Sequence, residues 1–189
     1  MIELVAVGGG VPPRRLDALV EDLERIFQVA CQLRPGSIGV EGALDAARQQ
    51  YHSTVILDSL RAHAPVNGSR LLGVAAVDLF VPIFTFVFGE AEVDGHCALA
   101  STYRLEEERY GLPADDGKLH QRLTKEAVHE LGHTFGLRHC DHWQCVMASS
   151  HSVERVDVKS AEFCEDCATR VRAIIARATP GSLPGARPS

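Results

Sequence analysis

The twelve residues from 129 to 140, His-Glu-Leu-Gly-His-Thr-Phe-Gly-Leu-Arg-His-Cys, constrain the fold of this 189-residue chain more than any other segment. Residues four apart on a helix share a face, so His129 and His133 can direct their imidazoles at one metal ion. Gly136 allows the helix to end in a left-handed conformation. The chain can then reverse and return His139 as a third ligand. Three neutral imidazoles leave a fourth position for solvent, which is typical of a catalytic zinc site.

Glu130 lies about 100° round the helix from His129, so it can reach a ligand of the ion without binding the ion itself. The His-Glu-x-x-His spacing alone is weakly specific, because two histidines and a glutamate also meet on solvated helix faces. The glycine and the third histidine at their fixed spacings make a chance match much rarer. Met147 lies eight residues beyond His139, in a short segment that could fold beneath the site.

Four cysteines follow the histidines in two closely spaced pairs. Four residues separate Cys140 from Cys145, and two separate Cys164 from Cys167. Four thiolates are enough for a closed tetrahedral zinc site. Disulfide pairing and unpaired buried thiols are the alternatives, but no secretion signal supports disulfides. We therefore expect a structural zinc that supplies folding energy to a small C-terminal subdomain.

The remaining cysteines and the single tryptophan have simpler interpretations. Cys31 and Cys97 lie in strand-like runs and are expected to be small core residues. Trp143 is expected to fill the core of the C-terminal subdomain. Because Cys140 adjoins His139, neighbouring residues would bind different ions. We therefore expect the structural ion to hold the third histidine in place.

Charge and hydropathy exclude several kinds of partner. The formal charge of −6 disfavours nucleic acid, whose binding proteins usually carry a basic face. The first residues lack the cationic stretch and long apolar run of a secretory signal, so we expect a cytoplasmic protein. Residues 71–88 approach bilayer length. However, Asp78 at their centre would cost about 2.5–3.5 kcal/mol in a bilayer, and the β-branched and aromatic content fits two buried strands broken near Pro82 better. No membrane partner is expected.

Hydrophobic periodicity and turn residues predict an α/β (α+β) domain with a mixed sheet in the first hundred residues. The predicted strands are 2–7, 30–33, 70–79, 84–93 and 97–105, and the predicted helices are 16–27, 42–63, 118–135 and 164–177. Asp115-Asp116-Gly117 is typical of a helix start. We expect one domain over residues 1–178, with an N-terminal subdomain 1–136 and a C-terminal subdomain 137–178. Residues 179–189 are expected to form a disordered tail.

These motifs resemble the metzincin zinc peptidases, whose long histidine motif is followed by a methionine-bearing turn beneath the metal. Among them, the sequence is similar to the archaemetzincins, which continue the motif with a cysteine after the third histidine. In that family a second cysteine follows five residues on, then x-Met, and later Cys-x-x-Cys. Sixteen residues lie between Met147 and Cys164, one fewer than in the family pattern. Residues 78–91 and 104–105 also look like that family, so the resemblance covers most of the chain.

The resemblance implies a metzincin-like zincin fold: a mixed twisted sheet, two long helices, an active-site helix and a zinc-stapled C-terminal subdomain. It also implies hydrolysis of peptide substrates by a zinc-activated water, with Glu130 as general base and then acid. Two zinc ions per chain are expected, one catalytic and one structural. Met147 and Gly136 would support the catalytic site. We expect a monomer.

Three points stay open at the level of sequence. The strand at 98–103 could be an edge to which an extended peptide adds by main-chain hydrogen bonds. The tyrosine that some metzincins carry after the methionine turn is absent, which leaves zinc, His142, His151 or a backbone N–H to stabilise the oxyanion. Two other functions also remain. One is a non-catalytic zinc-dependent peptide-binding module, and the other is a chain whose only metal is held by the four cysteines.

Overall fold

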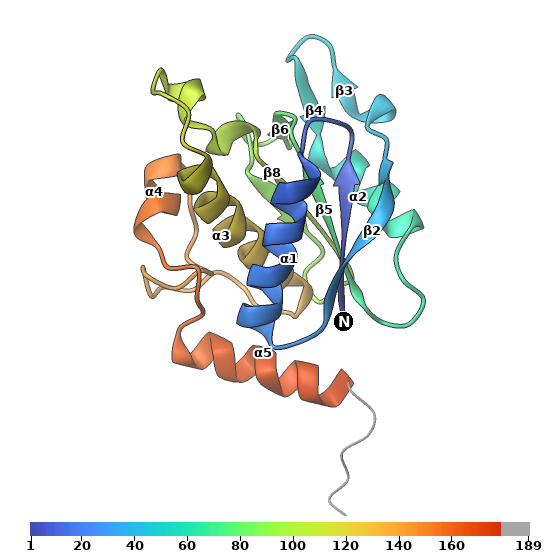
Figure 1. Ribbon diagram of the computed structural model, residues 1–189, viewed down its shortest axis with the longest axis vertical. Coiled ribbons are helices and arrows are strands. Elements are labelled where there is room, and N and C mark those ends of the chain that lie inside the picture. The colour runs from blue at the N-terminus through green and yellow to red at the C-terminus, as the bar shows by residue number, and fades with distance from the viewer. Residues whose placement is uncertain (179–189) are drawn as a thin grey trace, which may run out of the picture.

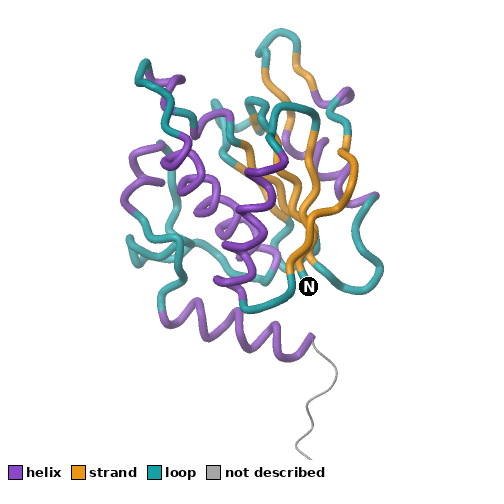
Figure 2. The backbone as a smooth tube through the Cα atoms, viewed as in Figure 1, coloured by secondary structure: helices purple, strands orange, loops and turns teal. Residues whose placement is uncertain are grey.

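The computed structural model describes residues 1–178, which form a five-stranded sheet with helices on both faces (Figures 1 and 2). The order of the strands is β2-β1-β5-β8-β7. The first four run parallel, and β7 is antiparallel to β8, so the sheet is mixed as predicted. The strands are β1 (Ile2–Val7), β2 (Cys31–Ile38), β5 (Arg70–Ala75), β7 (Gly89–Ala91) and β8 (Cys97–Ser101).

Five α-helices surround this sheet within the described residues: α1 (Pro13–Phe27), α2 (Ser53–Ala62), α3 (Asp116–Thr134), α4 (Val153–Val158) and α5 (Glu165–Ala178). Successive residues of a strand point to opposite faces. In β1, Ile2 and Leu4 therefore enter the core shared with α1 and α3, whereas Val5 and Val7 enter the core shared with α2. Helix α3 crosses the first face beside α1 (Figure 1).

The predicted helix over 42–63 is correct only in its second half, where α2 begins at Ser53. Residues 41–52 instead form η1 (Glu41–Ala43) and the short strands β3 (Leu44–Asp45) and β4 (Gln50–His52). The Asp45 carboxylate accepts hydrogen bonds from the N–H groups of Ala47 and Arg48, a local turn that competes with a helix. β4 then pairs with β6 (Leu79–Phe80) in a second, three-stranded sheet.

Four predicted strands have different limits in the structure. The strand expected over 70–79 ends as β5 at Ala75, and Leu79 begins the separate strand β6. The strand expected over 84–93 begins only at Gly89, and residues 81–88 form a loop. The strand expected over 97–105 ends at Ser101 and is followed by η2 (Tyr103–Leu105) and η3 (Glu107–Tyr110). β2 continues past the Pro35-Gly36 turn signal, because its pairing with β1 shifts register between Leu4 and Ala6.

The carboxylate in the apolar segment 71–88 has a folded-state explanation. Asp78 is buried, and it accepts hydrogen bonds from Arg104 Nε at 2.8 Å and from Gln50 Nε2 at 3.1 Å. A buried charge needs such partners. Among the helices of residues 1–178, none has the length and apolar content to cross a membrane.

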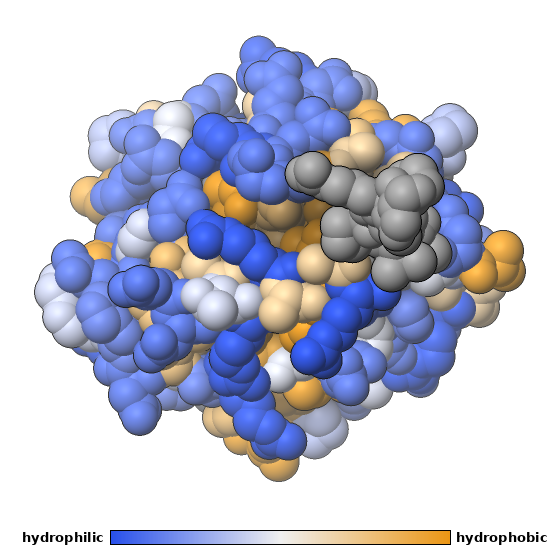
Figure 3. Space-filling model, turned by 90° about the horizontal axis from the view of Figure 1, so that it is seen from below, coloured by the Kyte–Doolittle hydropathy of each residue, from blue (hydrophilic) through white to orange (hydrophobic). Residues whose placement is uncertain are grey.

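The C-terminal part of the chain packs on the same core. Buried side chains at Leu137, Val146, Val156 and Val171 join the cluster that contains α1 and α3. The division into two subdomains stays a prediction, and the predicted tail 179–189 lies outside the described residues. Seen from the α5 end, the surface is mostly hydrophilic, with apolar side chains between polar ones near its centre (Figure 3).

Candidate active site

Helix α3 presents the histidine motif at its C-terminal end. Asp115 caps the start of the helix, because its carboxylate accepts a hydrogen bond from the Lys118 N–H at 2.8 Å. At the other end Gly136 adopts φ +74°, a left-handed conformation that glycine reaches without a steric penalty. The Leu137 N–H then bonds back to the Gly132 carbonyl at 3.1 Å. The chain thereby reverses, and His139 returns toward the helix.

The structure brings His129, His133 and His139 together. One ring nitrogen of each lies within 4.8 Å of those of the other two. The ring centroids are 4.7 to 5.3 Å apart. His129 is buried, whereas His139 is exposed. The cluster is therefore fixed on its inner side and open to solvent on the other.

Hydrogen bonds set the orientation of two of these rings. Nδ1 of His129 lies 2.8 Å from the Val146 carbonyl, and Nδ1 of His133 lies 2.8 Å from the Leu137 carbonyl. Burial lowers the pKa of both imidazoles, so each is neutral and its single proton is on Nδ1. The two Nε2 atoms, 3.1 Å apart, then face each other with lone pairs. A shared cation relieves that repulsion, and carbonyl-bonded imidazoles of this kind are the usual ligands of zinc.

Glu130 is buried beside the histidines, toward β7. Burial raises its pKa well above the usual value, the nearby charges of Glu126 and Glu90 raise it further, and Lys159 opposes them. The close approach depends on Gly89, because a Cβ there would lie 2.7 Å from Glu130 Cγ and 2.8 Å from Oε1. No local sequence pattern marks Gly89, because its contact with Glu130 joins segments that are distant in the chain.

Met147 lies beneath the histidine helix. It is fully buried, and a Cβ at Gly132 would come within 3.0 Å of its sulfur. The Met147 carbonyl also accepts a hydrogen bond from the Cys140 N–H at 3.0 Å. The segment around Met147 is therefore held against both the helix and the chain that carries His139.

The four C-terminal cysteines form a second cluster, with all four sulfurs within 4.8 Å of one another. Cys140 and Cys164 have their sulfurs 3.8 Å apart, and all six cysteines of the chain carry free thiols. The N–H of Cys167 lowers the pKa of Cys164, whereas burial raises that of Cys167 itself. Four thiols at this spacing match the donor set of a structural zinc. The prediction for the neighbouring Trp143 is wrong, because its side chain is 55% exposed.

The two cysteines outside this cluster, Cys31 and Cys97, agree with the predicted core role only in part. Cys97 is fully buried, and burial raises its pKa to about 11. Cys31 is only half-buried, although burial raises its pKa to about 12. Neither thiol is suited to nucleophilic or metal chemistry, because the thiolate is disfavoured.

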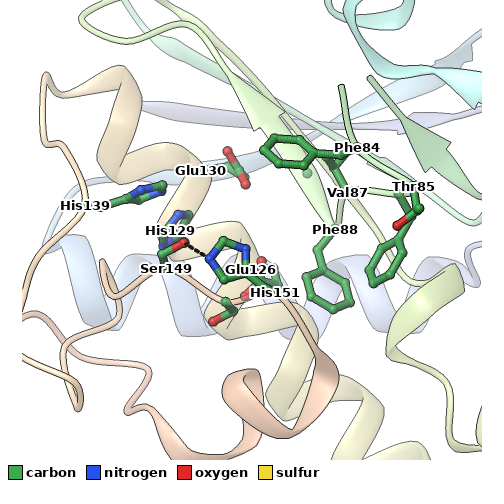
Figure 4. A pocket seen from close by; sticks show the side chains of 13 residues that line it. Phe84, Thr85, Val87, Phe88, Glu126, His129, Glu130, His139, Ser149 and His151 are labelled. Carbon is green, nitrogen blue, oxygen red and sulfur yellow. Dashed lines mark hydrogen bonds between the residues drawn. The ribbon is translucent and has the colours of Figure 1, made fainter. Parts of the chain in front are cut away.

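A cavity of about 290 Å³ opens beside the histidine cluster. The loop 84–88 and the start of β7 form one wall, and α3 and the segment 149–151 form the other (Figure 4). The cavity therefore lies beside the start of β7, which is the edge strand of the five-stranded sheet. The expected edge strand at 98–103 is wrong, because β8 lies inside the sheet between β5 and β7.

Comparison with known proteins agrees with this geometry. Residues 17–173 match the family described as peptidase family M54. An archaemetzincin of Methanocaldococcus jannaschii is 43% identical over 130 residues, which are 69% of this chain and 70% of that protein.

Solved structures extend the likeness to the whole fold. The crystal structure of archaemetzincin from Methanopyrus kandleri has a TM-score of 0.80 at 32% identity and covers 94% of this chain and 96% of that one. A zinc-dependent peptidase from Methanocorpusculum labreanum has a TM-score of 0.83 at 29% identity, covering 90% of this chain and 100% of that one. The resemblance to the archaemetzincins is therefore confirmed, and the chain belongs to peptidase family M54.

Proposed function

We propose that this zinc metallopeptidase hydrolyses peptide bonds with one zinc held by His129, His133 and His139 and with Glu130 as general base. The observation that carries the proposal is the convergence of three imidazoles beside a buried carboxylate, at the wall of a cavity. A zinc ion bound there lowers the pKa of water and polarises the substrate carbonyl.

Glu130 supplies the proton transfers. It accepts a proton from the water molecule whose oxygen adds to the peptide carbonyl carbon. It then delivers that proton to the amide nitrogen as the C–N bond breaks, which leaves a carboxylic acid and an amine. The acid then gives up its remaining proton to the amine, so the products are a carboxylate and an ammonium. A base must hold the proton between these two steps. The pKa of Glu130, raised by burial, suits that task.

We propose that the substrate is an extended peptide laid along β7. An edge strand offers main-chain N–H and C=O groups to which a further strand can add. β7 is such an edge strand, and its first residue lines the cavity. The wall carries Phe84, Phe86 and Phe88. We therefore expect a large apolar side chain next to the bond that is cut.

We propose a second, structural zinc at Cys140, Cys145, Cys164 and Cys167. Cys140 follows His139 directly and bonds through its N–H to the Met147 carbonyl. A metal at the cysteines would therefore restrain the third histidine and the segment beneath the active site, and binding at the two sites would be coupled.

The main alternative is a peptide-binding module that keeps zinc but does not turn over. The buried carboxylate of Glu130 argues against it, because a binding site gains nothing from a base there and burying it costs free energy. Digestion of a peptide library by the wild-type protein and by Glu130→Gln tests the choice. Cleavage by the wild type alone, with equal zinc in both, supports the peptidase; equal digestion, or none, contradicts it.

We also propose that the protein works in the cytoplasm as a monomer. Its six free thiols suit a reducing compartment. Cell fractionation and light scattering of the purified protein test these two expectations. Recovery in a secreted fraction, or a dimer mass, would contradict them.

A further inference from the structure

Hydrolysis of a peptide bond places negative charge on the former carbonyl oxygen, and that oxygen needs a hydrogen-bond donor. Glu130 is occupied with the proton transfers. We propose that His151 is this donor, a catalytic residue that hydrogen-bonds the oxyanion through a ring N–H and makes or breaks no covalent bond. The inference rests on the peptidase function proposed above.

The position of the ring supports the assignment. His151 lines the cavity together with Glu130 and His129, and its side chain is exposed to solvent. Figure 4 shows the imidazole on the same side of the cavity as Glu130 and His129, with Phe84 and Phe88 on the opposite side. A carbonyl group held against this wall would therefore meet both the base and His151.

The hydrogen bonds of the ring leave it a donor. Nε2 of His151 lies 3.4 Å from the Ser149 hydroxyl. A neutral imidazole has one N–H, so Nδ1 carries it and remains a donor when the Ser149 hydroxyl donates its hydrogen to Nε2. At 3.4 Å the existing contact is long and weak, so it leaves the polar groups of the ring free to bond a substrate oxygen.

The segment that carries His151 is anchored on both sides. Before it, the Val146 carbonyl bonds His129 Nδ1 at 2.8 Å. The Ala148 carbonyl lies 3.5 Å from the ammonium of Lys159, which is buried and paired with Glu126 at 2.9 Å. After it, α4 begins at Val153. A donor held in place before reaction stabilises charge without the cost of reorganisation.

The other polar groups of the cavity are less suited. Ser150 also lines the cavity, but its hydroxyl oxygen is buried and therefore less accessible to a substrate than the exposed ring of His151. Glu126 is paired with Lys159 and accepts rather than donates. Thr85 is on the opposite wall, among the aromatic residues of the loop. His142, the other candidate from the sequence, lies beside the cysteine cluster rather than in this cavity.

The test compares His151→Ala, His151→Gln and His142→Ala in the zinc-loaded protein. Steady-state kcat and KM are measured on a cleaved peptide. Calorimetry gives the Kd of a phosphinic peptide, whose tetrahedral oxygens mimic the oxyanion. The Kd of the uncleaved peptide is measured in the Glu130→Gln background, with and without His151→Ala. Zinc content is measured for every variant.

We expect His151→Ala to lower kcat about 10²- to 10³-fold, the usual effect of removing one oxyanion donor, with KM nearly unchanged. The phosphinic Kd should rise by a similar factor while the Kd of the uncleaved peptide stays constant. His151→Gln should recover part of the loss, because its amide donates a hydrogen bond. His142→Ala should behave as the wild type, and zinc content should be equal throughout.

Three results would overturn the role of His151: an unchanged kcat in His151→Ala, equal weakening of both ligands, or loss of zinc from that variant. If the wild type cleaves and Glu130→Gln does not, such a result removes the His151 proposal alone. If the zinc-loaded wild type cleaves no peptide, both the proposed function and this inference fail.

Discussion

Replacing Gly89 by alanine tests how closely β7 must approach the catalytic helix. The new Cβ would lie 2.7 Å from Glu130 Cγ and 2.8 Å from Oε1, short of the 3.4 Å of ordinary van der Waals contact by about 0.6 to 0.7 Å. The Cβ would also meet the Leu99 carbonyl oxygen within 3.0 Å. That oxygen belongs to the inner strand β8 and cannot move freely, so Glu130 is displaced.

The clash should lower both the rate of peptide cleavage and the stability of the fold. A misplacement approaching 1 Å costs up to about 10²-fold in rate, so we expect kcat/KM to fall about 10- to 10²-fold. Overpacking of this kind costs about 1–3 kcal/mol. In a protein of this size that lowers Tm by about 2 to 12 °C.

The assay is peptide cleavage combined with thermal unfolding at saturating zinc. Gly42→Ala is the matched control, because a Cβ at Gly42 meets nothing within 4 Å. It should retain wild-type kcat/KM and Tm. Wild-type cleavage and stability in Gly89→Ala would refute the argument that glycine is required beside Glu130.

The other predictions concern the base, the cysteine cluster and acid stability. Glu130→Gln should lower kcat by about 10²- to 10⁴-fold with zinc content unchanged, and undiminished turnover would contradict its role. Cys145→Ser should weaken zinc binding at the histidine cluster as well as at the cysteines, as measured by titration with a chelator; full affinity at the histidines would reject the coupling. Hydrogen bonds from Arg122 hold the pKa of the Asp157 carboxyl below its usual value. This pair therefore stabilises the fold above about pH 4. Its contribution is lost as the pH falls through the lowered pKa. Asp157→Asn should therefore lower the free energy of unfolding in urea at pH 6 more than at pH 3, and an equal decrease at both pH values would count against this.

The histidine cluster was predictable because its three members are close in sequence. His129 and His133 share a helix face by spacing alone, and Gly136 marks the reversal that returns His139. The same is true of the four cysteines, which come in two short-range pairs. Local patterns also located β1, α1 and α3, whose periodicity is strong.

Features that depend on distant contacts were missed. The place of β8 inside the sheet and of β7 at its edge is set by pairing between strands, which no local pattern carries. The buried pair of Lys159 and Glu126 joins residues 33 positions apart, and Gly89 matters only because Glu130 packs against it. The hairpin at residues 44–52 was mistaken for helix because its Asp45 turn outweighs the apolar periodicity.

The central claim is that three histidines of this chain bind a zinc ion separate from the one at the cysteines. The most direct test is the zinc content per chain of the wild type and of His133→Ala, measured by mass spectrometry. We predict two ions in the wild type and one in the variant, with peptidase activity lost in the variant. One ion in both proteins, or an unchanged second ion in the variant, would contradict the account.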